Sequence, residues 1–231
     1  MRIFVMLLTG FCLTAFSSFG QINAETATKH VIVKFAPLGL FDYDNVVQFG
    51  VEVPLGISGL SVQQDLGYGH SSFNLWYTSE PGPRKETYKS RTQLRYYYYP
   101  RRRFKAYVAG EFLLKKVIYA ENKWVGMDCS GWDCGYYENR FVKVGRYVSA
   151  GHVKMGWQFY FGNRMALDLF TGLGIRNIRV KSITPMLSDM RVERPNTWFG
   201  FDSPGTNEIV PSVAMGFHFG IVLGKFENKQ P

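Results

Sequence analysis

Cysteine is scarce in this chain, with 3 residues in 231. Cys12 lies inside an apolar N-terminal stretch, which leaves Cys129 and Cys134 for the rest of the chain. Two thiols with no histidine beside them are too few for a zinc site, so we predict neither a metal nor a cofactor. We expect instead a disulfide between Cys129 and Cys134, which would close a small loop that carries Trp132.

Long apolar runs are also rare. The first stretch of the chain has one: Arg2 precedes an apolar segment over residues 3–16, and small residues before Gln21 suit a cleavage site. We predict a cleaved signal peptide over residues 1–20, with Ala24 as an alternative cleavage point, and no lipid anchor on Cys12. No later stretch has an apolar run long enough to form a transmembrane helix.

Acidic residues are outnumbered: the 27 Lys and Arg residues exceed the 18 Asp and Glu residues, for a net charge of +9. An exported basic chain meets no nucleic acid, so the acidic partners that we expect are lipid phosphates and sugar acids. Aromatic residues make up 16% of the chain and glycine numbers 24. Both features are typical of membrane barrels, which have aromatic belts and close-packed interior glycines.

The strongest pattern is a hairpin over residues 152–176, where apolar and polar residues alternate with the period of a β-strand. Long connections are expected over residues 69–86, 117–139 and 182–208, with a shorter one near Asp42. Short turns are expected near Gly56, Pro100 and Gly162. The same alternation predicts eight strands, over residues 31–35, 47–55, 60–68, 88–99, 104–114, 141–161, 165–176 and 212–223.

Eight strands joined alternately by short and long connections are typical of outer-membrane barrels. We predict an all-β fold, an eight-stranded antiparallel transmembrane β-barrel over residues 31–226, followed by a short periplasmic tail over residues 227–231. Both termini are then periplasmic, and the predicted location is the outer membrane. The bulky, almost uncharged residues face lipid, and the small or pairable residues fill the lumen.

Strand parity directs residues of both charge signs into the lumen. A buried charge is tolerated when it is paired, and eight strands leave room only for side chains. We therefore predict an ion-paired plug rather than a conducting pore. The predicted network consists of Lys34, Glu52, Asp65, Arg91, Arg95, Glu111, His152, Lys154, Asp168 and Arg176.

A second basic set lies toward the outer ends of the strands. An ordinary solvated rim is one interpretation of this set, and contact with lipopolysaccharide phosphates is the other. The candidates for lipid-phosphate contact are Arg84, Lys85, Lys89, Lys143, Arg146, Arg179 and Lys181. Arg101 to Arg103, at the opposite end, are expected to face anionic headgroups.

Catalysis has only weak candidates. His70 and Ser72 share one face of a strand, which is the arrangement that a histidine-activated serine hydrolase uses. Ser149 and His152 lie on opposite faces by parity. His152 and His218 both face inward and are expected to meet a carboxylate such as Asp168, as paired interior histidines. We therefore predict no enzymatic activity, and a lipid A-modifying acyl hydrolase or acyltransferase is the alternative.

The mature chain resembles the small eight-stranded outer-membrane barrels of the OmpA type. Residues 33–38, residues 94–98, and residues 161–164 leading to 172–174 are similar to an uncharacterised outer-membrane family, one of the numbered domains of unknown function. The resemblance implies a fold, an address and delivery by the barrel-assembly machinery, but no activity. One departure is that Phe226 does not end the chain. We predict a structural, adhesive or loop-mediated binding role, with a secreted lipocalin-like carrier as a third possibility.

Overall fold

The computed structural model describes residues 30–41, 45–55, 59–73, 84–101, 103–130, 133–162, 164–184, 191–192 and 204–224. The predicted signal peptide, the C-terminal tail, the loop tip at Trp132 and Arg102 lie outside the described residues. No helix in the described part of the chain is long and apolar enough to cross a membrane.

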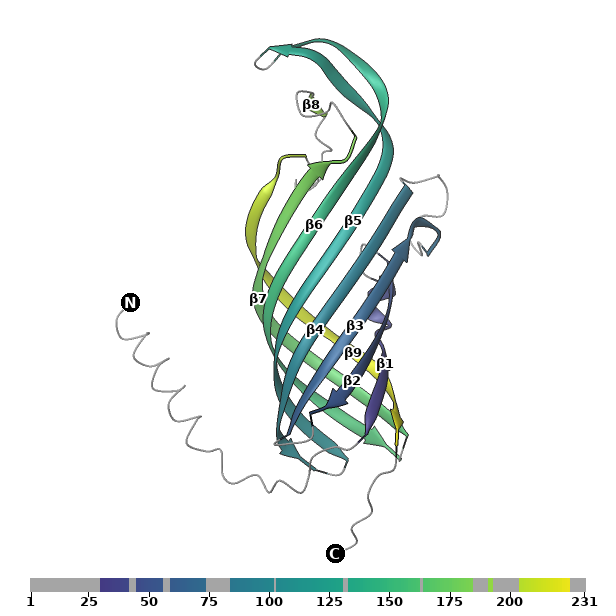
Figure 1. Cartoon of the computed structure of the whole chain (residues 1–231), viewed down its shortest axis with the longest axis vertical. Helices are drawn as coiled ribbons and strands as arrows, with labels where there is room; N and C mark the ends of the chain where they lie inside the picture. Colours follow the sequence, from purple (N-terminus) through teal and green to yellow (C-terminus); the bar gives the residue numbers. More distant parts are fainter. Residues whose placement is uncertain are drawn as a thin grey trace, which may run out of the picture.

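The described chain is built almost entirely of β-strands (Figure 1). One short helix and one 3-10 turn interrupt them. The elements are β1 (Val31–Phe35), α2 (Leu38–Phe41), β2 (Val46–Pro54), β3 (Leu60–His70), η2 (Ser71–Phe73), β4 (Arg84–Pro100), β5 (Phe104–Ser130), β6 (Asp133–Phe161), β7 (Met165–Ser182), β8 (Arg191–Val192) and β9 (Asn207–Leu223).

Eight of the strands form a closed ring. Each pairs antiparallel with its neighbours, in the order β4-β3-β2-β1-β9-β7-β6-β5, and β5 pairs again with β4 to close it. The pairing register shows that the strands are staggered around the ring. Following paired residues from Phe49 on β2 through β3, β4, β5, β6 and β7 leads to Ile209 on β9. Following them the other way, through Phe35 on β1, leads to Phe219, ten residues further along β9. Such a stagger tilts the strands against the axis of the ring, as Figure 1 shows.

The two faces of the ring have the opposite composition to that of a water-soluble protein, with apolar side chains outside and charged side chains inside. Large apolar side chains point outward and are exposed, such as Val153 at 74% and Met215 at 71%. Charged side chains point inward and are buried, such as Arg95 at 0% and Lys34 at 1%. The predicted alternation is therefore present in the structure, with the polar set enclosed.

Short connections join the strands at one end of the ring. Gly162 has a φ of 61° and Gly59 a φ of 73°, values that strain residues with a Cβ. The glycines therefore permit the tight reversals from β6 to β7 and from β2 to β3. These positions agree with the short turns that the sequence predicts.

The predicted long connection over residues 117–139 is wrong, because both of its sides continue as strands. β5 and β6 stay paired from Phe104 and Phe159 to Ser130 and Asp133, and the hairpin rises above the other strands (Figure 1). The Gly-Trp-Asp segment and the charged residues near it suggest a loop, but inward-facing valines continue the period of two. They join β7 in a buried apolar cluster of Val125, Val142, Val144, Ile178 and Val180.

The tip of this hairpin carries a disulfide. Cys134 is disulfide-bonded, and Cys129 lies directly opposite it in the ladder. The predicted third connection, over residues 182–208, also contains structure that the sequence did not suggest: β8 pairs with Val125 and Gly126 of β5. A two-residue strand is too short to produce a periodic signal.

Candidate functional site

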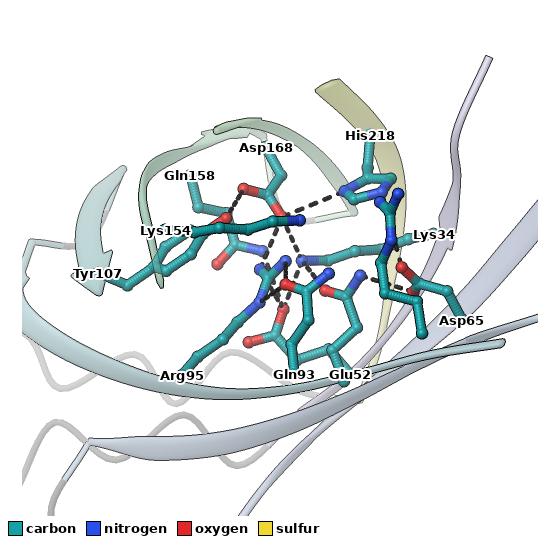
Figure 2. Close-up of polar contacts among 12 residues, drawn as sticks. Lys34, Glu52, Asp65, Gln93, Arg95, Tyr107, Lys154, Gln158, Asp168 and His218 are labelled. Carbon is teal, nitrogen blue, oxygen red and sulfur yellow. Dashed lines mark hydrogen bonds and ion pairs between the residues drawn. The ribbon is translucent and has the colours of Figure 1, made fainter. Parts of the chain in front are cut away.

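The interior of the ring is organised around Asp168 on β7 (Figure 2). Its Oδ2 atom lies 2.7 Å from Lys34 Nζ and 2.6 Å from Arg95 Nη1. The Tyr107 hydroxyl donates a hydrogen bond of 2.7 Å to the other oxygen, Oδ1. The exposure of Asp168 is 1%, so two cations and a hydroxyl replace its hydration.

Glu52 on β2 is the second carboxylate of this layer. Its Oε2 atom lies 2.5 Å from Lys34 Nζ and 3.3 Å from Arg95 Nη1. Ser61 donates a hydrogen bond of 2.6 Å to Oε1, and the Tyr97 hydroxyl donates to the same oxygen. Lys34 and Arg95 therefore each bridge two carboxylates, which distributes the charge over strands β1, β2, β4 and β7.

Glutamine side chains complete the hydrogen bonding of these charges. Gln63 accepts from Lys34 at 3.0 Å and donates to Asp65 at 2.6 Å, while Gln48 donates to Asp65 at 3.1 Å. Gln93 accepts two hydrogen bonds from Arg95, of 3.2 and 2.9 Å. The sequence prediction did not include these glutamines, although their parity is inward and could have identified them.

Aromatic rings also support the cations. The Arg95 guanidinium lies 4.3 Å from the centroid of the Tyr107 ring. Gly156 on β6 makes room for that ring, since a Cβ there would lie 2.3 Å from Tyr107 Cζ. Lys154 Nζ lies 4.2 Å from the centroid of the Phe170 ring. Both contacts have cation-π geometry.

A second cluster surrounds Glu111 on β5. Arg91 Nε lies 3.3 Å from Glu111 Oε2, and Lys154 Nζ contacts the same oxygen. His152 Nδ1 lies 3.2 Å from Glu111 Oε1. His152 Nε2 lies 3.0 Å from Ser212 Oγ. Each described member of this cluster comes from a different strand of the ring, except that His152 and Lys154 share β6.

The histidines differ from one another in their partners. His218 lies near Asp168, with Nδ1 3.6 Å from Oδ2, and stacks on Phe170. His152 also meets a carboxylate, but this is Glu111, which lies opposite it in the ladder, rather than Asp168. Inward parity is shared by both residues, but parity does not specify the strand that a side chain reaches across.

Nine of the ten predicted interior residues fall into these two groups. Arg176 does not: its Nε atom is buried and has no hydrogen-bond partner among the residues that the structure describes. In the two groups, Lys34, Arg91, Arg95 and Lys154 face four carboxylates. The carboxylates are Glu52, Asp65, Glu111 and Asp168. Within these two groups, four cations thus face four carboxylates.

The seven residues predicted to contact lipid phosphate divide between the two faces. Four of them are exposed on the outward face: Arg84, Lys143, Arg179 and Lys181. Lys85 and Arg146 are partly buried on the inward face, where both cations lie 5.5 Å from the centroid of the Tyr119 ring. Lys89 is also inward, opposite Lys115. For these three, strand parity contradicts the predicted lipid contact.

His70 and Ser72 lie close together at the C-terminal end of β3. His70 Nδ1 is 2.9 Å from Ser72 Oγ, and the Ser72 backbone N–H donates to the same nitrogen at 3.1 Å. Ser72 lies inside the turn η2, which begins at Ser71, rather than continuing the strand. The histidine nitrogen is therefore an acceptor that faces a hydroxyl, which is the local geometry of a general base.

Groups of metal ligands are absent from the described residues, where no three His, Cys, Asp or Glu side chains gather around one point. No protein-family model, curated protein or solved structure matches this chain. The interpretation of the site therefore depends on its own geometry.

Proposed function

We propose that this protein is an integral outer-membrane β-barrel whose interior is closed by side chains and whose outer hairpin is the binding element. The observation that carries the proposal is the inverted composition of the ring. Exposed Val153, Leu173 and Met215 would be costly in water as one continuous surface. The same side chains suit the hydrocarbon core of a bilayer, where a closed ring leaves no strand edge unpaired.

The interior supports a plug rather than a pore. Arg95, Gln93 and Gln158 are each no more than 1% exposed, and they lie in the layer of Asp168 and Glu52. Side chains from strands on all sides meet there, so an ion would have to displace paired charges. A carrier of apolar ligands would need an apolar cavity in this position, and the charged layer argues against the lipocalin-like alternative.

The β5–β6 hairpin provides a surface for binding. Its outward face displays Trp124, Tyr137 and Phe141, each more than half exposed. The disulfide at Cys134 and the pairing of β8 with β5 brace this segment. Large aromatic side chains on a braced element lose little conformational entropy on binding, as in other recognition surfaces. This arrangement supports the adhesive or loop-mediated role.

Fractionation and conductance test the proposal together. We expect the full chain to stay with the membrane fraction after an alkaline wash and to migrate differently on gels before and after heating. In planar bilayers the purified protein should give no stable channels. Recovery in the soluble fraction would contradict the membrane location, whereas stable channels would contradict only the closed interior.

The contact between His70 and Ser72 supports a second candidate function, an acyl hydrolase that acts on membrane lipid. In that case the purified protein should release fatty acid from lipid A, and Ser72→Ala should lower the rate at least about a hundredfold. Ser71→Ala is the matched control, because the hydroxyl in contact with His70 belongs to Ser72. Unchanged acyl patterns in cells with and without the wild-type protein would reject this function.

A further inference from the structure

The outward face carries a row of tyrosines and cations on neighbouring strands. The ladder places Tyr88 opposite Lys116, Lys116 opposite Tyr147, and Tyr147 opposite Arg179. Tyr68 on β3 extends the row beyond Tyr88. Side chains directly opposite each other in an antiparallel pair have Cβ atoms about 5 Å apart, so these groups form one continuous surface.

Lys116 is a cation of this row that is not among the candidates for lipid-phosphate contact predicted from the sequence. It is exposed on the outward face, and its Nζ atom lies 5.6 Å from the centroid of the Tyr147 ring. Arg179 is exposed on the other side of the same tyrosine. Neither cation forms an ion pair with a residue that the structure describes. A lone cation beside the lipid-facing surface is costly unless it lies at the level of polar headgroups.

A groove runs beside the row. It has a volume of about 540 Å³ and is lined by side chains that include Leu66, Tyr88, Ser90, Leu114 and Lys116. The small Ser90 forms its floor between two leucines, and Gln64 satisfies the Ser90 hydroxyl with a hydrogen bond of 3.1 Å. The groove is therefore apolar along its length and cationic at one rim, as a lipid chain with an anionic head requires.

The outward face has a one-sided charge at this end. Below the tip of the hairpin, the described strands present five outward cations: Arg84, Lys116, Lys143, Arg179 and Lys181. The one outward carboxylate in that zone is Glu86, which accepts a hydrogen bond of 3.4 Å from Tyr88. This imbalance favours an anionic partner over a protein surface of mixed charge.

We propose that Lys116 and Arg179, on either side of Tyr147, bind the phosphate of an anionic lipid of the outer leaflet, with an acyl chain in the groove beside Leu114. The inference rests on the proposed membrane location. The proposed contact with lipid is one site on β4, β5, β6 and β7, rather than a basic rim spread around the ring. Tyr147 holds the Lys116 ammonium by its ring, which places the cation for the phosphate.

The test measures binding of bisphosphorylated lipid A to the refolded full chain in detergent micelles by native mass spectrometry. Wild type should bind it at least about fivefold more tightly than a phosphate-free glycolipid with the same acyl chains. Lys116→Gln and Arg179→Gln should each weaken binding about fivefold. Lys143→Gln, an outward cation outside the row, is the matched control and should leave binding unchanged. Glu86→Gln should tighten binding about threefold, since it removes the nearby negative charge.

The outcomes separate the site from the membrane location. A chain that inserts into liposomes but binds phosphorylated and phosphate-free lipid equally would overturn the site and leave the proposed function standing. Equal loss in Lys143→Gln would also overturn it, because a diffuse rim predicts that result. A chain that fails to insert into liposomes would overturn the proposed function itself. Inorganic phosphate alone should not compete at the concentrations of lipid used, and competition would assign the site to free anions.

Discussion

Asp168→Ala should lower the free energy of unfolding by about 3–5 kcal/mol, because it removes one of the two carboxylates that Lys34 and Arg95 share and leaves both buried cations to Glu52. Lys34 and Arg95 both lie within 2.7 Å of the Asp168 carboxylate, and the side-chain exposures of both cations are 0%. The Tyr107 hydroxyl also loses its acceptor. Urea unfolding of the refolded protein in detergent, followed by circular dichroism, measures the change.

Glu138→Gln is the matched control for that substitution. Glu138 pairs with Arg140 at 2.8 Å on the hairpin, where both side chains are 45% exposed. An exposed ion pair contributes about 0–1 kcal/mol, so the control should unfold almost as the wild type does. If Asp168→Ala and Glu138→Gln lowered stability equally, the interior layer would be solvated rather than closed, and the plug would be contradicted.

A double variant distinguishes charge pairing from packing. Replacing Arg95 by methionine in the Asp168→Ala background removes one of the two cations that the first substitution leaves with a single shared carboxylate, Glu52. Part of the lost stability should return, because an uncompensated buried charge costs more than an apolar replacement of similar length. A further loss equal to that of Arg95→Met alone would indicate that the two residues act independently.

The period of two explains why so much of this fold is predictable from sequence. In β6 and β7 each residue faces either the interior or the outside, and residues such as Lys154 and Leu173 differ in polarity accordingly. One inward or outward assignment therefore determines a whole strand. The same rule, applied without exception, would have placed Lys85, Lys89 and Arg146 inside and Lys116 outside.

Partners across the ring are less accessible to sequence reasoning. Lys34 and Asp168 are 134 positions apart in the chain, and the stagger of the ring brings them together. Alternation predicts whether a side chain faces the interior or the outside, but not its height, which is its position along the axis of the ring. His152 and His218 could therefore not be assigned to different carboxylates from the sequence. The height depends on the register of all eight strands, which no local pattern contains.

The hairpin shows a different limit. Residues 117–139 combine charged side chains with the Gly-Trp-Asp segment near Cys134, and these features are typical of a loop. Residues 117–130 and 133–139 are strands instead, because β5 pairs with β6 along this segment and packs through Val125 and Val142. Tertiary contacts thus override local composition in the segment that we propose to carry binding.

Leu173→Arg should prevent stable assembly in the membrane, at a cost of about 2–4 kcal/mol if the residue lies near the bilayer midplane. Leu173 is 69% exposed on the outward face of β7, opposite Val153. Phe141→Arg is the matched control: Phe141 is also apolar and exposed, at 52%, but it lies on the part of β6 that extends beyond its pairing with β7.

The two variants should differ from each other in a membrane barrel and behave alike in a soluble ring. In a bilayer, the arginine at Leu173 must leave water, whereas the arginine at Phe141 remains solvated, so only the first should reduce heat-modifiable protein in the membrane fraction. In a soluble ring, both substitutions would replace an exposed apolar side chain by a charged one and would leave folding intact or improve solubility. Equal tolerance of Leu173→Arg and Phe141→Arg would therefore reject the membrane location, because a bilayer penalises a cation in its hydrocarbon core and accepts one beyond it.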